Sequence, residues 1–179
     1  MILTGPEITS ASKDGRLRIS PFTATQINPN SYNVRLGGTL LTYTDQVLDT
    51  HRPNPTRRTE IGDDGHVLQP GELHLGHTLE RTGSESYAQL LNGDRTTGSL
   101  GIWVHVSAPL GHQGHAIRWT LEIRATRPVR VRPGMAFGKL VFLRTHGSPA
   151  SYQQHGLKYR ASEGIETSRL YEENPGGRR

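Results

Sequence analysis

Residues 93–122 bring together side chains that could bind an anion and a side chain that could move a proton. The first part is polar and glycine-punctuated, and it carries Arg95, Thr96, Thr97 and Ser99. Successive backbone N–H groups in a glycine-rich turn form a concave site for an anion such as phosphate. After a hydrophobic run over residues 102–106, the stretch ends at Glu122, which could supply acid–base chemistry. The pattern predicts an anion loop leading to a catalytic carboxylate, although a surface loop before two ordinary strands would share this pattern.

Three histidines in the same stretch raise the alternative of a metal site. His112 and His115 could present two imidazoles, and Glu122 could add a carboxylate, which are ligand types of catalytic zinc. His105, however, lies within the apolar run, where a hydrogen-bonded core histidine is more typical. We therefore predict that the protein supplies no metal site of its own.

The composition limits the classes of protein that fit. The 179 residues include no cysteine, which excludes disulfides, thiolate catalysis and cysteine-bound zinc. The net charge of +5 suggests an anionic partner, either a phosphorylated metabolite or nucleic acid. We favour the small anion, because few aromatic residues lie among the basic ones. Neither the first six residues nor any apolar run has the length of a signal peptide or membrane span, so we predict a soluble, cytoplasmic protein without membrane partners.

The elements that must position these side chains are short, because 21 glycines and 11 prolines interrupt the chain. One helix is expected over residues 7–14, with Pro6 at its start and Gly15 at its end. Strands are expected over residues 17–19, 32–36 and 39–43, around Pro-Gly turns in 67–75 and 129–137, and over 139–144. Residues 44–65 are expected to form a surface loop or arm, and no helix is expected after residue 14. The pattern predicts an all-β barrel or sandwich, in one domain over residues 1–170 with a flexible tail over 171–179.

Several stretches, taken in order, resemble the trimeric dCTP deaminase and dUTPase superfamily. They are residues 1–8 (MILTGPEI), 28–37 (NPNSYNVRLG), 68–73 (LQPGEL), 100–108 (LGIWVHVSA), 119–122 (WTLE) and 131–135 (VRPGM), with Lys158, Tyr159, Arg160, Gly164, Ser168 and Arg169. The resemblance implies a distorted β-barrel or jelly-roll-like subunit and a homotrimer with active sites shared between subunits. It also implies metal-independent hydrolytic deamination of a cytosine nucleotide, with Mg²⁺ accompanying the phosphates.

The resemblance also assigns roles to individual residues. Glu122 matches the catalytic glutamate, and Ala108 matches the residue whose backbone carbonyl holds the attacking water. Thr120 lies where a residue helps to distinguish cytosine from uracil. Lys158 matches a lysine that reaches the phosphates, and Tyr152 an aromatic residue that covers the nucleotide.

Other positions depart from the family pattern, mostly where the phosphates and the sugar bind. The family sequence Arg-Ser-Ser followed by a second arginine falls on Asp94, Arg95, Thr96 and Ser99. His112 replaces a sugar-binding aspartate, and Ser162 replaces a phosphate-binding glutamine. These departures predict a cytosine nucleotide or nucleoside other than the usual substrate, for example one with fewer phosphates. The alternatives are a non-catalytic nucleotide-binding or regulatory trimer and a dUTPase-like pyrophosphatase.

Overall fold

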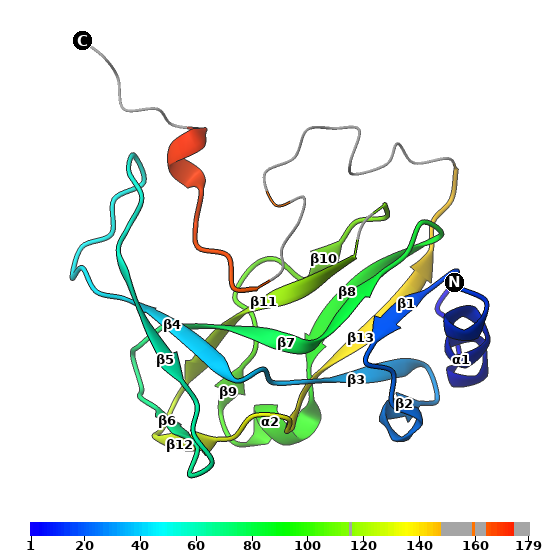
Figure 1. Ribbon diagram of the computed structural model, residues 1–179, viewed down its shortest axis with the longest axis horizontal. Coiled ribbons are helices and arrows are strands. Elements are labelled where there is room, and N and C mark those ends of the chain that lie inside the picture. Colours follow the sequence, from blue (N-terminus) through cyan, green and yellow to red (C-terminus); the bar gives the residue numbers. More distant parts are fainter. Residues whose placement is uncertain (115, 148–158, 160–163, 174–179) are drawn as a thin grey trace.

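The computed structural model describes residues 1–114, 116–147, 159 and 164–173, and this part of the chain is mostly β-structure (Figure 1). One sheet has the order β5 (Thr56–Glu60), β4 (Thr39–Tyr43), β7 (His74–Gly83), β11 (Ala116–Ala125), β9 (Ile102–Trp103), and β1 (Arg18–Ser20) also pairs with β7. The second sheet has the order β10 (Leu110–Gly111), β8 (Tyr87–Gly93), β13 (Ala136–Arg144), β3 (Ser31–Arg35), β2 (Ile27–Asn28). A small ribbon pairs β12 (Val129–Val131) with β6 (His66–Leu68). The mostly β prediction is confirmed.

The core joins the two larger sheets, because alternate residues of their strands point inward. On β11, Trp119, Leu121 and Ile123 are buried, whereas the residues between them are partly accessible. On β13, Leu140 and Phe142 are fully buried and belong to the same hydrophobic cluster. The period of two is that of a strand with one buried face. One face of β11 therefore packs in the core and leaves the other face available for a site.

Local signals explain the elements that the sequence predicts. Helix α1 (Gly5–Lys13) has Pro6 in its first turn and is followed by Gly15 at φ +80°. Its residues Ile8 and Ala11 are buried. Gly71 and Gly134 have φ of +81° and +77° in the Pro-Gly turns before β7 and β13, as the predicted turns require. The expected helix and both Pro-Gly turns are confirmed.

Two local predictions were wrong. The expected arm contains strand β5, which pairs along its length with β4, from Thr39↔Glu60 to Tyr43↔Thr56. Residues 95–99 form a five-residue helix, α2 (Arg95–Ser99), where no helix was expected. Its N-cap is Asp94, whose side chain accepts a hydrogen bond from the Thr96 N–H. This cap stabilises a helix too short to show a helical period in the sequence.

The β4–β5 hairpin neutralises much of its own basic charge. Arg52 Nη2 lies 3.1 Å from Asp45 Oδ2, and Arg58 Nε lies 2.7 Å from Glu60 Oε1. These ion pairs count against nucleic acid as the anionic partner. In the described part of the chain, no helix has the length and apolar character needed to span a membrane.

Candidate active site

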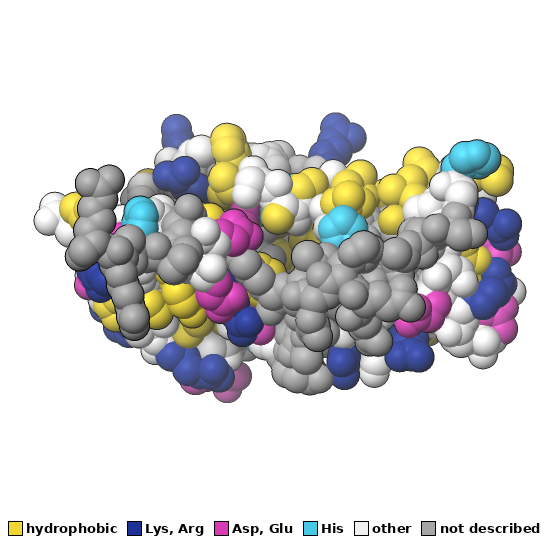
Figure 2. Space-filling view, turned by 90° about the horizontal axis from the view of Figure 1, so that it is seen from above, with side chains coloured by type: hydrophobic (Ala, Val, Ile, Leu, Met, Phe, Trp, Pro, Cys, Tyr) yellow, Lys and Arg dark blue, Asp and Glu magenta, His cyan; other side chains and the backbone are white. Residues whose placement is uncertain are grey.

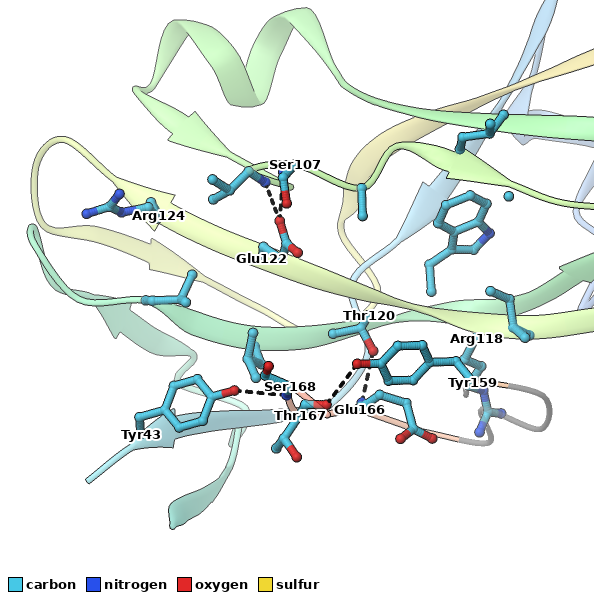
Figure 3. Close-up of a pocket in the computed structure, with 18 of the residues that line it drawn as sticks. Tyr43, Ser107, Arg118, Thr120, Glu122, Arg124, Tyr159, Glu166, Thr167 and Ser168 are labelled. Carbon is cyan, nitrogen blue, oxygen red and sulfur yellow. Dashed lines mark hydrogen bonds between the residues drawn. The ribbon is translucent and has the colours of Figure 1, made fainter. Parts of the chain in front are cut away.

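A pocket of about 780 Å³ opens beside the accessible face of β11 (Figure 3). Four alternate residues of this strand, Arg118, Thr120, Glu122 and Arg124, line it together with Ile117 and Trp119. The loop and strand before β11 contribute residues 106–108 and 110–112, and the C-terminal segment contributes Tyr159 and residues 166–168. Tyr43, Leu48, Leu73 and Leu75 supply a more apolar wall. The pocket thus combines apolar side chains with cations, hydroxyl groups and carboxylates.

Glu122 is held by the backbone of the facing loop. Its Oε2 accepts hydrogen bonds from the Val106 N–H at 2.6 Å and the Ser107 N–H at 2.9 Å (Figure 3). Among the described residues, none is hydrogen-bonded to Oε1. Ala108 follows Ser107 and lines the same pocket. One carboxylate oxygen is therefore fixed while the other can exchange a proton with a bound molecule.

Thr120 is linked to the C-terminal segment. Its Oγ1 accepts a hydrogen bond from the Glu166 N–H at 2.9 Å, and Tyr43 Oη accepts one from the Ser168 N–H at 3.1 Å. Tyr159 Oη lies 3.5 Å from the Thr167 carbonyl oxygen, to which it donates. These contacts make the segment one wall of the pocket, as Figure 3 shows.

Buried polar contacts fix the floor of the pocket at Trp119. Its indole N–H donates to Thr82 Oγ1 at 3.0 Å, and the Thr82 hydroxyl donates to Gln89 Oε1 at 2.6 Å. Gly111 allows the ring to lie there, because a Cβ at residue 111 would come within 2.6 Å of Trp119 Cζ2. The floor is therefore set by a hydrogen-bond chain that joins both large sheets.

The residues predicted to form an anion loop lie elsewhere. Arg95, Thr96, Thr97 and Ser99 belong to α2, and none of them lines this pocket. Asp94 Oδ1 accepts hydrogen bonds from the Thr96 N–H at 2.8 Å and hydroxyl at 2.6 Å, and Lys139 Nζ lies 3.1 Å from Asp94 Oδ2. The Thr96 hydrogen bonds, with help from Lys139, hold the pKa of Asp94 below its usual value. A carboxylate of the chain itself therefore occupies the Thr96 donors at the start of α2.

Other predicted residues divide into three groups. Ala108, His112, Thr120 and Glu122 line one pocket, as described above. Tyr152, Lys158 and Ser162, together with His115, lie outside the described residues. His105 is half-buried, with Nε2 3.1 Å from the Leu91 carbonyl oxygen. Within the described ranges, no group of three or more His, Asp or Glu side chains has an arrangement that could hold a metal ion.

Sequence reasoning missed several pocket residues. Arg118, Arg124, Tyr43 and Glu166 were not predicted, although Tyr159 and Ser168 belong to a stretch that carried the resemblance. The available signal for the two arginines was the alternation on β11, which places them on the same face as Thr120 and Glu122. Tyr43 and Glu166 enter the site only through tertiary packing.

The fold and pocket define a β-sheet protein in which a carboxylate on the central strand β11 faces a pocket lined by apolar and polar side chains. A family described as dCTP deaminase-like matches residues 2–145. The chain is 39% identical over 173 residues to a dUMP-forming dCTP deaminase of Clostridium beijerinckii, with 97% of this chain and 98% of the relative covered. It is 40% identical over 175 residues to the enzyme of the same description from Clostridium acetobutylicum, with 97% and 98% covered. The protein therefore belongs to the dCTP deaminase-like family.

A solved structure supports the fold. The crystal structure of 2′-deoxycytidine 5′-triphosphate deaminase from Agrobacterium tumefaciens matches with a TM-score of 0.65 and 19% sequence identity. The match covers 81% of this chain and 48% of that chain, so this chain corresponds to about half the length of the solved one.

Proposed function

We propose that the protein is a hydrolytic cytosine nucleotide deaminase that converts dCTP to dUMP. The single observation that carries this is the Glu122 carboxylate, fixed in the pocket by the Val106 and Ser107 N–H groups. Family membership and the dUMP-forming relatives support the choice of substrate and product. The balanced reaction consumes dCTP and two waters, and it releases dUMP, ammonia and pyrophosphate.

In the proposed deamination, Glu122 acts as both base and acid. Its carboxylate takes a proton from a water held beside the Ala108 carbonyl, and the water oxygen bonds to C4 of cytosine. Glu122 passes this proton to N3, then takes the proton of the new C4 hydroxyl and passes it to the amino group, so that the C4–N bond breaks and ammonia leaves as the C4 carbonyl forms. Such a step requires no bound metal as Lewis acid. The chain has no cysteine with which to form the Cys-x-x-Cys segment of zinc deaminases.

Formation of dUMP requires a second hydrolysis, at the α-phosphorus, in which the bond to the bridging oxygen breaks and pyrophosphate leaves. This favours a triphosphate substrate over the cytosine compounds with fewer phosphates that the sequence departures suggested. Mg²⁺ would arrive with the triphosphate and neutralise part of its charge. Of the described pocket carboxylates, Glu122 is assigned to proton transfer and Glu166 lies 3.4 Å from the Arg169 guanidinium. We therefore assign no protein cage to this ion.

We further propose that the chain works as a homotrimer of distorted-barrel or jelly-roll-like subunits with shared active sites. Four large hydrophobic side chains near the pocket and α2 are more than half exposed, namely Leu100, Trp103, Val106 and Leu110. Hydrophobic side chains also reach the surface on the face shown in Figure 2. In such an assembly, Arg95, Thr96, Thr97 and Ser99 of α2 would serve the pocket of a neighbouring subunit.

The test is turnover of dCTP, CTP, dCMP, CMP and dUTP, with separate measurement of ammonia, pyrophosphate and nucleotide products. We expect dCTP to give dUMP, ammonia and pyrophosphate. Glu122→Gln keeps an oxygen acceptor for the two N–H groups but cannot exchange the proton, so deamination should fall by about 10²–10⁴-fold. Glu85→Gln, which changes an exposed glutamate in the same way, should leave the rate unchanged.

Two outcomes would overturn the proposal in favour of its alternatives. Binding of dCTP without any product would indicate a non-catalytic nucleotide-binding trimer. Formation of dUMP from dUTP, with no ammonia from any cytosine substrate, would indicate a dUTPase-like pyrophosphatase.

A further inference from the structure

The pairing of β7 with β11 is irregular beside the pocket. Between two regular pairs, the ladder skips one residue on β11, Trp119, and three residues on β7, numbers 78–80. Such a β-bulge bends the strand and redirects its side chains, and bulges are common next to active sites. The regular pairs on either side are Arg118↔Arg81 and Thr120↔His77.

The bulge widens the wall that β11 gives to the pocket. Successive side chains of a regular strand point to opposite faces, yet the consecutive residues 117–120 all line the pocket. Residues 116–118 are all partly accessible, and the alternation of buried and accessible residues begins only at Trp119. Ile117 and Trp119 therefore join the pocket where the pairing is irregular.

Thr78 satisfies the backbone at the bulge. Trp119 has no ladder partner on β7, and its backbone N–H donates instead to Thr78 Oγ1 at 3.0 Å. The Thr78 hydroxyl donates in turn to the Glu80 carbonyl oxygen at 2.7 Å. Thr78 is fully buried, and a buried N–H without an acceptor is costly. Removal of the hydroxyl should therefore make the bulge rearrange.

The β7 side of the bulge is anchored to the second sheet. Glu80 is fully buried, its Oε2 accepts the Arg35 backbone N–H at 2.8 Å, and its Oε1 accepts the Arg35 Nε–H at 2.6 Å. Thr78 also forms a β-bridge with Leu36, which follows β3. Residues 78–80 are thus held by β3, and the Thr78 hydroxyl transmits this position to Trp119.

We propose that Thr78 is a positioning residue of the candidate active site. It does not line the described pocket itself, and it acts through Trp119 and Thr120, which form the floor and part of the wall. Glu122 has a separate anchor in the facing loop (Figure 3). Loss of the Thr78 hydroxyl should therefore disturb nucleotide binding more than proton transfer. The bulge follows from the hydrogen bonds, whereas the effect on dCTP rests on the proposed function.

The experiment compares Thr78→Val, which keeps the shape but removes the hydroxyl, with Thr78→Ser, which keeps the hydroxyl. The matched control is Thr42→Val on β4, because Thr42 is also buried and its hydroxyl has no hydrogen-bond partner among the described residues. We expect Thr78→Val to raise the KM for dCTP about ten-fold and to change kcat by less than about two-fold. Thr78→Ser should recover most of the affinity, and Thr42→Val should behave like the wild type.

The division between KM and kcat separates positioning from a loss of stability. A variant that is only less stable contains fewer active molecules, so its apparent kcat falls while its KM stays constant. An unchanged KM in Thr78→Val would therefore overturn the inference. Calorimetry of dCTP binding gives the same comparison without turnover. Affinity that falls in Thr78→Val but not in Thr42→Val, in a protein that forms no product, would support the positioning role and count against the proposed function alone.

Hydrogen exchange in the wild type tests the bulge even if Thr78→Val does not fold. The Trp119 amide should exchange slowly, because its acceptor is a buried hydroxyl. Exchange at the rate of an exposed amide would overturn the inference.

Discussion

Glu122 and Glu166 are the two carboxylates among the described pocket residues, and their surroundings differ. Glu122 receives two neutral backbone N–H donors on one oxygen. Glu166 lies 3.4 Å from the guanidinium of Arg169, three residues along the chain. Glu166 is thus tied to a neighbouring side chain, whereas Glu122 Oε1 has no hydrogen-bond partner among the described residues. The surroundings therefore favour Glu122 as the residue that transfers protons and Glu166 as part of the wall.

His74 makes folding sensitive to acid. It is 1% exposed, and neither ring nitrogen has a well-aligned hydrogen bond, although Glu72 Oε2 lies 3.2 Å from Nε2. Burial lowers the pKa of His74 and nearby His66 lowers it further, while Glu72 opposes the shift. The unfolded chain, with a histidine pKa near 6.5, therefore binds this proton more readily. The contribution of His74 to the free energy of unfolding should therefore have its full value above pH 6.5 and should decrease as the pH falls below 6.5.

Urea unfolding between pH 8 and pH 5 tests this prediction. Each unit by which the folded pKa lies below the unfolded one contributes about 1.4 kcal/mol. His74→Gln should lower stability near pH 8 and flatten its decline in acid, whereas His146→Gln, at an exposed position, should keep the wild-type slope. Equal acid slopes in the wild type and His74→Gln would show that another group is responsible.

At the scale of elements, α2 depends on its cap. With five residues it has too few internal hydrogen bonds to persist alone. We expect Asp94→Ala to reduce the free energy of unfolding by about 1 kcal/mol, because the Thr96 N–H loses its acceptor. Asp94→Asn should retain most of the stability, since asparagine also caps helices. Denaturant titration measures the free energy of unfolding of both variants, and Asp63→Ala, at an exposed turn, is the control. If Asp94→Asn loses as much stability as Asp94→Ala, the ion pair with Lys139 rather than the cap is responsible.

The elements that could be predicted are those with local signals. Pro6 and Gly15 bound α1, and the Pro-Gly turns locate β7 and β13. Strand β5 was missed because its sequence, Thr-Arg-Arg-Thr-Glu, is polar throughout and its only strand partner among the described residues is β4. Of the site, Glu122 and its neighbours on β11 were accessible to motif reasoning. The hydrogen bond between Thr78 and Trp119 was not, because the register between two strands 41 positions apart is a property of the folded sheet.

At the scale of the whole molecule, the prediction to test is that three chains assemble into a homotrimer. Each chain has a mass of 19.8 kDa, so sedimentation of a trimer should give about 59 kDa, three times that value. Trp103 is 59% exposed on β9, at the end of the larger sheet. Trp103→Glu should shift the mass toward that of one chain and reduce turnover, because a buried unpaired charge is strongly unfavourable.

Val47→Glu is the matched control for assembly, since Val47 is 79% exposed at the β4–β5 hairpin. It should leave both mass and turnover unchanged. A fully active wild-type protein that sediments as one chain would contradict the proposed assembly.

The alternation of β11 has a consequence for redesign. Residues 118, 120, 122 and 124 line the pocket, while Trp119, Leu121 and Ile123 between them are buried. Pocket-lining and core positions are thus interleaved along one strand, and Trp119 belongs to both groups because it is buried and also forms the pocket floor. A library restricted to the codons of residues 118, 120 and 124 would vary what the protein recognises while the residues that hold the sheets together stay constant. The ten residues of β11 are therefore a compact unit in which nucleotide preference can be changed while the rest of the fold is kept.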